Sequence, residues 1–151
     1  LLAARLDVRF IELDALVHGP DWVETPDDEL RRTLRPLLEE DGWVVDGNYR
    51  NKIGDLVTAK ADLVVWLDLP VRVWLPRLIH RTLRRAIRQE VLWNGNRESL
   101  KTSFWGRDSL VAFALRTYGE RRATWPALLA PHRTERLRTT RAVKQFVERF
   151  G

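Results

Sequence analysis

The sequence predicts an α/β fold in three layers, with helices on both faces of a parallel β-sheet. Candidate strands alternate with candidate helices over residues 1–88, and this alternation is typical of parallel sheets with crossover helices. The clearest strand, 61–67, is an almost continuous apolar run, which indicates a strand covered on both faces. Trp66 in this strand and Trp43 in the preceding one are expected in the core. The 151 residues suffice for one such domain, 1–151.

The elements expected in the first half alternate in type. They are a helix over 1–6, a strand over 8–13, a loop over 17–25, a helix ended by Asp41-Gly42, a strand over 43–45 and a short helix over 51–59. The helix before Asp41 is predicted to begin at Thr25, a hydroxyl cap residue, with Pro26 in its first turn and carboxylates at 27–29.

The second half begins with a helix that carries a stripe of arginines. Pro70 ends the apolar strand, because proline has no amide to donate to a central ladder. The helix that follows places five guanidiniums within an arc of about 100°. They belong to Arg77, Arg81, Arg84, Arg85 and Arg88. The remaining expected elements are a polar excursion over 96–107, a helix over 109–129, a strand over 134–138 and a helix over 141–150.

Composition excludes several classes of protein. The absence of cysteine excludes a disulfide scaffold, a thiolate nucleophile and a cysteine-bound metal. The three histidines, His18, His80 and His132, lie too far apart in the sequence to suggest a site. No apolar run approaches the roughly 20 residues needed to cross a bilayer, and the start does not resemble a signal peptide. We therefore expect a cytoplasmic protein that does not bind membranes.

The net charge of +5 conceals a division between the two halves. Residues 1–70 hold 8 basic and 15 acidic side chains, whereas residues 71–151 hold 18 basic and 6 acidic side chains. This asymmetry indicates an anionic ligand that is bound mainly by the second half. Nucleic acids and phosphorylated small molecules both fit that description.

Three aspartates, Asp14, Asp46 and Asp68, fall at or just after the carboxyl ends of predicted strands. These ends share one edge of a parallel sheet, so the three carboxylates could converge. Together with an arginine-lined helix they would suit Mg²⁺ and phosphate. For Asp68, which directly precedes Leu69-Pro70, a structural role as a cap of the next helix is the preferred interpretation.

The motifs around these aspartates resemble those of P-loop kinases. Asp46-Gly47-Asn48-Tyr49-Arg50 is similar to the Asp-Gly-Phe-Pro-Arg segment of adenylate kinases. Asp68-Leu69-Pro70 resembles the Asp-Val-Pro segment of that family, and Arg77 and Arg81 follow Asp68 at the family's offsets of nine and thirteen residues. Together with Trp22 and the segment 92–99, these motifs make the chain most similar to the adenylate-kinase-related group called DNA topology modulation proteins.

This resemblance implies an ATP-dependent phosphotransferase with ATP and Mg²⁺ as cofactors, acting on a small acceptor that bears a hydroxyl or a phosphate. Asp46 would hold Mg²⁺ through water, and Asp14 would orient or deprotonate the acceptor. The residues implied to bind the acceptor are Asp14, Asn48, Tyr49 and Arg50. Those implied to neutralise phosphate are Arg77, Arg81, Arg107 and Arg116, of which Arg77, Arg81 and Arg116 would contact the nucleotide. Residues 89–118 would form a lid-like insertion.

The chain contains no methionine and no Gly-x-x-x-x-Gly-Lys-Ser/Thr loop, the motif that binds phosphates in this superfamily. Residues 1–6 resemble the interior of the helix that follows this loop in the family. We therefore expect a fragment that lacks the first strand and the phosphate-binding loop, and that is inactive on its own.

Two other functions remain open. The basic second half, with Trp93 and Trp105 in a polar segment, is compatible with single-stranded nucleic-acid binding. A non-catalytic member of the fold that serves as a structural partner is the other alternative. The acceptor, the oligomeric state and the physiological role are not predicted.

Overall fold

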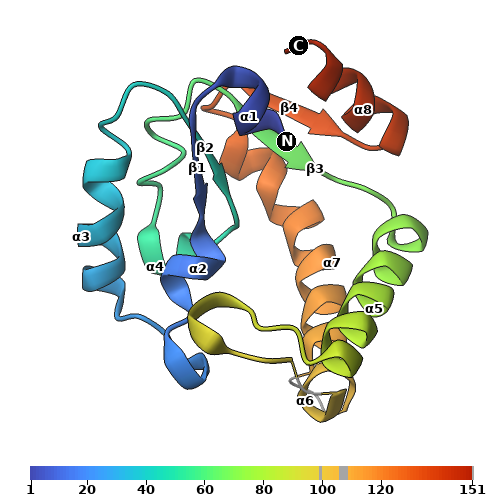
Figure 1. The fold of residues 1–151 in the computed structure, drawn as a ribbon. Coiled ribbons are helices and arrows are strands. Elements are labelled where there is room, and N and C mark those ends of the chain that lie inside the picture. The colour runs from blue at the N-terminus through green and yellow to red at the C-terminus, as the bar shows by residue number, and fades with distance from the viewer. Residues whose placement is uncertain (99, 106–108, 151) are drawn as a thin grey trace.

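Two pairs of parallel strands form the framework of the molecule (Figure 1). The computed structural model describes residues 1–98, 100–105 and 109–150. Strand β1 (Arg9–Glu12) pairs with β2 (Trp43–Asp46), and β3 (Val64–Leu67) pairs with β4 (Thr134–Leu137). The prediction of an α/β fold with parallel strands is confirmed. The strands nevertheless form two two-stranded sheets, where the sequence predicts a single sheet.

Helices surround the two strand pairs (Figure 1). They are α1 (Leu2–Leu6), α2 (Leu13–Val17), α3 (Asp27–Leu37), α4 (Arg50–Ile53), α5 (Val71–Arg88), α6 (Leu100–Phe104), α7 (Leu110–Leu129) and α8 (Thr140–Glu148). Two short 3₁₀ turns, η1 (Pro20–Trp22) and η2 (Trp93–Gly95), contact each other although they are distant in the sequence. None of the helices described here combines the length and the apolarity that crossing a membrane requires.

The main apolar core lies between α3 and the β1–β2 pair. Leu30 and Leu34, one turn apart on α3, are fully buried in one cluster with Ile11, Leu13 and Val17. The apolar residues of α3 recur with the period of a helix, so they form a single stripe that faces this cluster. This core fixes α2, the helix that follows β1 directly.

The start of α3 differs from the prediction. The hydroxyl of Thr25 does not cap this helix but donates to the main-chain carbonyl of Leu16 at 2.7 Å. The helix begins after Pro26 without a side-chain cap, and the carboxylates at 27–29 occupy its first turn, where the helix dipole stabilises negative charge. Thr25 therefore ties the loop to α2.

Strand β3 is less covered than predicted. Trp66 is buried, as expected, and its ring centroid lies 5.4 Å from that of Trp125 on α7. Leu67, in contrast, is 58% exposed, and Trp43 on β2 is only half-buried. Within the described residues, β2 and β3 each pair with a single strand.

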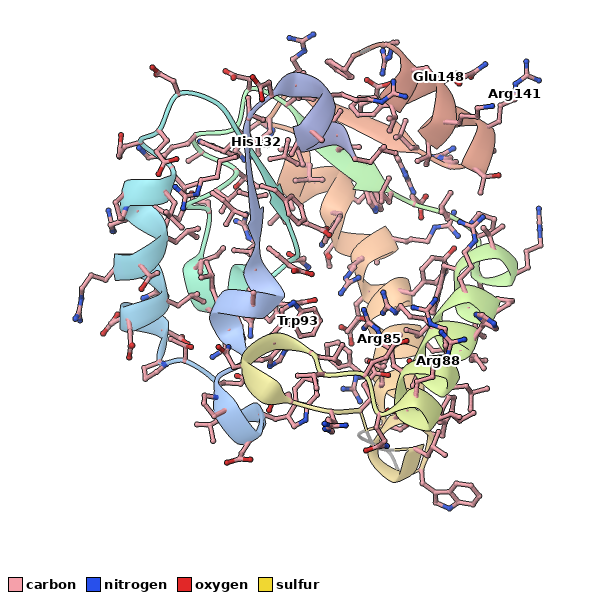
Figure 2. All side chains as sticks on the ribbon, viewed as in Figure 1. Arg85, Arg88, Trp93, His132, Arg141 and Glu148 are labelled. Carbon is pink, nitrogen blue, oxygen red and sulfur yellow. The ribbon has the colours of Figure 1, made fainter. Side chains whose placement is uncertain are left out.

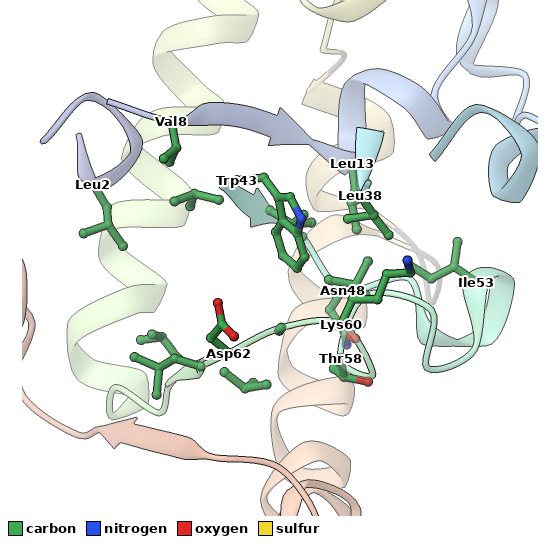
Figure 3. A pocket seen from close by; sticks show the side chains of 18 of the residues that line it. Leu2, Val8, Leu13, Leu38, Trp43, Asn48, Ile53, Thr58, Lys60 and Asp62 are labelled. Atoms are coloured by element: carbon green, nitrogen blue, oxygen red, sulfur yellow. The ribbon is translucent and has the colours of Figure 1, made fainter. Parts of the chain in front are cut away.

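A cavity of about 730 Å³, which we call the inter-sheet slot, separates β2 from β3. Its wall includes Val44 and Val45 of β2 and Val64 and Val65 of β3. Figure 3 shows Trp43 among the side chains that surround this space. The slot thus lies between two strands that are not hydrogen-bonded to each other.

Replacing Leu34 by alanine should destabilise the protein, because it removes a fully buried side chain and leaves a void. We expect the free energy of unfolding to fall by about 2–5 kcal/mol in urea denaturation. Ile87→Ala on α5, where the side chain is 72% exposed, should change it by less than about 0.5 kcal/mol. Equal losses in the two variants would contradict this placement of the core.

Candidate functional site

A second cavity, of about 1040 Å³, lies between the ends of β1 and β2 on one side and helices α5 and α7 on the other. We call it the central cavity. The predicted site residues that line it are Asp14, Asp46, Asn48, Tyr49, Arg81 and Arg116. Asp68 lines it as well, so all three aspartates that follow strands meet in one cavity. Residues that are far apart in the sequence are therefore brought together here.

Asp14, in the first turn of α2, is held by a tyrosine. Tyr49 Oη donates to Asp14 Oδ1 at 2.5 Å, and His18 Nε2 lies 3.1 Å from the same hydroxyl. Burial and the hydrogen bond to Asp14 raise the pKa of Tyr49 above its usual range, so the phenol keeps its proton. Since this one proton goes to Asp14, His18 Nε2 is the donor toward the hydroxyl. Among the described residues, no hydrogen bond occupies Asp14 Oδ2.

His18 lies within a group of aromatic rings. Its ring centroid is 5.3 Å from that of Trp22, 6.2 Å from that of Tyr49 and 6.1 Å from that of Trp93. The guanidinium of Arg85, on α5, lies 5.9 Å from the ring centroid of Trp93. Figure 2 shows Trp93 and Arg85 between α2 and α5. The aromatic group thus connects the strand side of the cavity to the helix side.

Two asparagines fasten η2 to the strand side. Asn94 Nδ2 donates to the main-chain carbonyl of His18 at 2.5 Å. The side chain of Asn96, which is buried, donates to the carbonyl of Gly19 at 2.8 Å and accepts from the main-chain N–H of Trp22 at 2.9 Å. Asn94 adopts a left-handed conformation, with φ of 55°, that asparagine tolerates better than most residues. We call these contacts the asparagine clamp; they join segments 74 to 77 residues apart.

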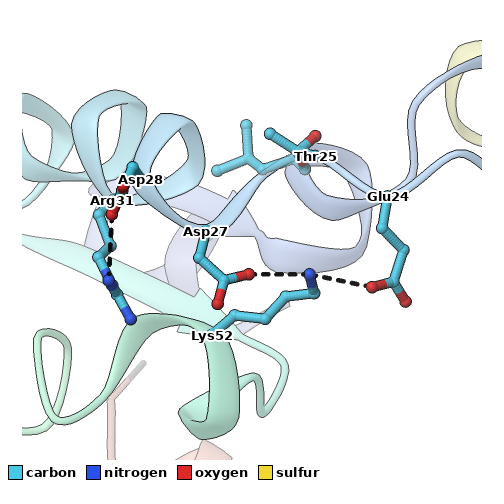
Figure 4. Close-up of polar contacts among 7 residues, drawn as sticks. Glu24, Thr25, Asp27, Asp28, Arg31 and Lys52 are labelled. Carbon is cyan, nitrogen blue, oxygen red and sulfur yellow. Dashed lines mark hydrogen bonds and ion pairs between the residues drawn. The ribbon is translucent and has the colours of Figure 1, made fainter.

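Lys52 lies between two carboxylates on the strand side (Figure 4). Its Nζ is 2.9 Å from Glu24 Oε2 and 3.1 Å from Asp27 Oδ1. Hydrogen bonds to Glu24 and Asp27 raise the pKa of Lys52. Because two carboxylates already surround this ammonium group, it offers little positive charge to a ligand in the central cavity.

The helix side of the central cavity is rich in arginine. Arg81 of α5 and Arg116 and Arg121 of α7 line it, and none of the three forms an ion pair with a residue that the structure describes. Arg121 lies 5.7 Å from the ring centroid of Trp125, and burial lowers its pKa. Arg121 is partly desolvated, so an anion beside its guanidinium would offset part of the cost of burial. We call these three residues the arginine wall.

Asp68 is a buried ion-pair centre, so the prediction that it caps α5 is wrong. The residue is 3% exposed. Its Oδ2 lies 2.7 Å from Arg136 Nη2 and 3.8 Å from Arg138 Nε, and its Oδ1 lies 3.2 Å from Arg122 Nε. Helix α5 begins after Pro70 and has no side-chain cap. Asp68 therefore joins the end of β3 to α7 and β4.

Two residues implied by the family resemblance, Arg50 and Arg77, do not line the central cavity. Arg77 is exposed on α5 and is absent from the lining. Arg50 lines the inter-sheet slot, where its Nη1 is buried and has no hydrogen-bond partner among the described residues. Arg107 lies outside the described residues.

Two residues of the site are not identified by the sequence patterns. The other histidines are far from His18 in the sequence, which argues against a site, but the partners of His18 in the structure are a tyrosine and two tryptophans. Arg121 follows Arg116 by five residues, a spacing that does not place two side chains on one helix face. Only the presence of several arginines in the helix over 109–129 could have drawn attention to it.

Comparisons with protein-family models, with curated proteins and with solved structures gave no match to this chain. The function is therefore argued from the geometry and the charges of the central cavity. The features that matter are a carboxylate held by Tyr49, an exposed carboxylate at Asp46 and the arginine wall opposite them.

Asp68→Asn should strongly destabilise the protein, because it leaves three guanidiniums beside a buried neutral amide. We expect the free energy of unfolding to fall by about 3–5 kcal/mol, measured by urea denaturation. The matched control is Asp55→Asn, which makes the same chemical change at an exposed position and should have little effect. A small loss in Asp68→Asn would show that the ion pairs do not hold α7 against β3.

The raised pKa of Tyr49 should make stability depend on alkaline pH. The native protein keeps this proton above the ordinary tyrosine pKa of about 10, whereas the unfolded chain releases it. The free energy of unfolding should therefore decrease as the pH rises past about 10. Urea denaturation between about pH 9 and about pH 11 measures the slope. Tyr49→Phe should reduce the slope, whereas an unchanged slope in this variant would reject the assignment.

Proposed function

We propose that this chain forms the acceptor-binding and phosphate-neutralising part of an ATP-dependent phosphotransferase of the P-loop kinase type. The observation that carries the proposal is the construction of the central cavity. Two carboxylates, Asp14 and Asp46, lie on its strand side, and the arginine wall lies on its helix side. Phosphoryl transfer depends on positioning and on electrostatic stabilisation. It is therefore served by carboxylates and arginines that face each other across one cavity.

The arginine wall is the part suited to the phosphates of ATP. Guanidinium groups make paired hydrogen bonds to phosphate oxygens and neutralise charge that develops during transfer. Arg81 and Arg116 are the two arginines that both the family resemblance and the cavity lining select. Arg121 adds a third, and an anion beside it would offset the cost of its burial.

Asp14 is the group suited to the acceptor. Its Oδ1 receives the proton of Tyr49, which fixes the orientation of the carboxylate and directs its second oxygen to other partners. In the proposed reaction the acceptor hydroxyl gives its proton to Asp14 Oδ2 while its oxygen attacks the γ-phosphorus. The bond from that phosphorus to the bridging oxygen breaks, and ADP leaves.

Asp46 fits the role of a magnesium ligand. It is the last residue of β2, it is exposed, and it lines the central cavity. The described residues contain no group of three or more side chains that could hold a metal by themselves. Mg²⁺ needs no such group, because it binds through one or two carboxylates, water and substrate phosphates. Bound there, Mg²⁺ would neutralise phosphate oxygens.

The inter-sheet slot supports the family assignment from the fold. One further parallel strand, placed between β2 and β3, would pair with both free edges and unite the two sheets. Its flanks would be the valines that now line the slot: Val44, Val45, Val64 and Val65. A phosphate-binding loop at the carboxyl end of that strand would begin near the central cavity, since β2 and β3 both end there.

Arg81→Ala in the complete protein should lower the rate of phosphoryl transfer at least about tenfold, equivalent to about 1.4 kcal/mol of transition-state stabilisation. The measurement is ADP release with ATP, Mg²⁺ and a working acceptor. The matched control is Arg88→Ala, an exposed arginine two turns further along the same helix, which should retain activity. Unchanged turnover in Arg81→Ala would refute the role of the arginine wall.

The same variants separate phosphotransfer from nucleic-acid binding. A nucleic-acid surface would use the exposed arginines of α5, so Arg88→Ala would then weaken the binding of single-stranded DNA. That binding would also decline steeply with salt, because phosphate contacts release counterions. If the protein is a phosphotransferase, Arg81→Ala should impair ligand binding more than Arg88→Ala does, and ATP should bind better than single-stranded DNA.

A further inference from the structure

Among the described residues, the strand side of the central cavity carries more carboxylates than lysine or arginine side chains. Its lining there consists mainly of acidic, amide and aromatic side chains: Asp14, His18, Trp22, Glu24, Asp46, Asn48, Tyr49 and Asn51. The lysine of this side, Lys52, has a side chain that is 13% exposed and lies between Glu24 and Asp27. The carboxylates of Asp14 and Asp46 have no counter-ion among the described residues.

Two arginines that line the central cavity make other contacts. Arg85, which lies beside Trp93, is 3.4 Å from the carboxylate of Glu98, whose side chain is only 10% exposed. Arg97 Nη1 donates to the main-chain carbonyl of Gln89 at 2.5 Å. Arg50, which could have received an anionic acceptor, lines the inter-sheet slot and not this cavity.

We infer that the acceptor of the proposed phosphotransferase is a hydroxyl compound without negative charge, either neutral or carrying an amine. This inference rests on the proposed function and narrows the acceptor class, which the sequence left as hydroxyl-bearing or phosphate-bearing. A phosphate group beside Asp14 would be repelled by this half-buried carboxylate, because water screens charge less well there than in bulk solvent. A hydroxyl group can donate to Asp14 Oδ2, and an amine would be attracted to the Asp14 carboxylate.

The aromatic lining supports the same class of acceptor. Trp22 is 40% exposed, so part of its ring is available to the carbon skeleton of a ligand or to an ammonium group. Tyr49 cannot serve as a second donor for an anionic ligand, because its proton is directed to Asp14. Among the described residues, the polar groups left to recognise the acceptor on this side include the amides of Asn48 and Asn51, the two carboxylates and the buried Nδ1 of His18, which has no hydrogen-bond partner there.

The test compares matched pairs of compounds with the complete protein. The pairs are glycerol and glycerol 3-phosphate, ethanolamine and phosphoethanolamine, and adenosine and AMP. Thermal shift without nucleotide measures binding, and ADP release with ATP and Mg²⁺ measures transfer. We expect at least one unphosphorylated member to bind and to be used at least about tenfold better than its phosphorylated partner. Asp14→Asn should abolish this binding, whereas Asp55→Asn should preserve it.

A charge-addition variant tests the electrostatic basis directly. Asn51→Arg places a guanidinium on the strand side of the cavity. The added charge should reduce the preference for the unphosphorylated member over its phosphorylated partner at least about tenfold. Gln145→Arg adds the same charge to an exposed position of α8 and should leave the preference unchanged.

Three results overturn the inference: a phosphorylated member that binds or reacts better than its partner, no Asp14-dependent binding by any unphosphorylated member, or a preference that Asn51→Arg leaves intact.

The proposed function is refuted by different results. If unphosphorylated compounds bind in an Asp14-dependent manner but no ADP forms with any of them, phosphotransfer is refuted and the acceptor class stands. If ADP forms faster with the phosphorylated compounds than with their unphosphorylated partners, the acceptor class is refuted and phosphotransfer stands.

Discussion

The buried carboxylate of Asp68 is the interaction on which the arrangement of the central cavity depends. It lies at the end of β3, and its three arginine partners come from α7, from β4 and from the residue after β4. A carboxylate removed from water needs such partners, so its burial requires α7 to pass close to the end of β3. That path brings Arg116 and Arg121, which lie on the same helix, to the cavity.

The acidic and basic halves of the sequence line opposite sides of the central cavity. The acidic first half supplies Asp14 and Asp46, and the basic second half supplies the arginine wall. The ligand pair of the proposed reaction, with phosphates at one end and an uncharged hydroxyl compound at the other, would be complementary to both sides. Like charges gathered on one side of the cavity repel one another, which lowers the stability of the protein without ligand. The same charges attract a ligand of opposite charge.

The sequence predicted the parts of this protein that local interactions determine. The helix over 71–88 and the buried position of Trp66 follow from apolar periodicity, which a short segment carries by itself. The roles of Thr25 and Asp68 could not be predicted in this way. Each side chain has a helix start nearby in the sequence but binds a group that only the folded chain brings close. Arg121 was missed for the same reason, because two helices and a strand end define its surroundings.

The asparagine clamp makes the two sides of the cavity thermodynamically linked. It holds η2 to the segment that follows Asp14, while Trp93 of η2 contacts Arg85 of α5. A ligand that moves α5 must therefore also shift η2 or break its hydrogen bonds to His18 and Gly19. Linkage is reciprocal, so in the proposed phosphotransferase the factor by which nucleotide changes acceptor affinity would equal the factor by which acceptor changes nucleotide affinity. Two side-chain amides would then contribute to the cooperativity between the two proposed substrates.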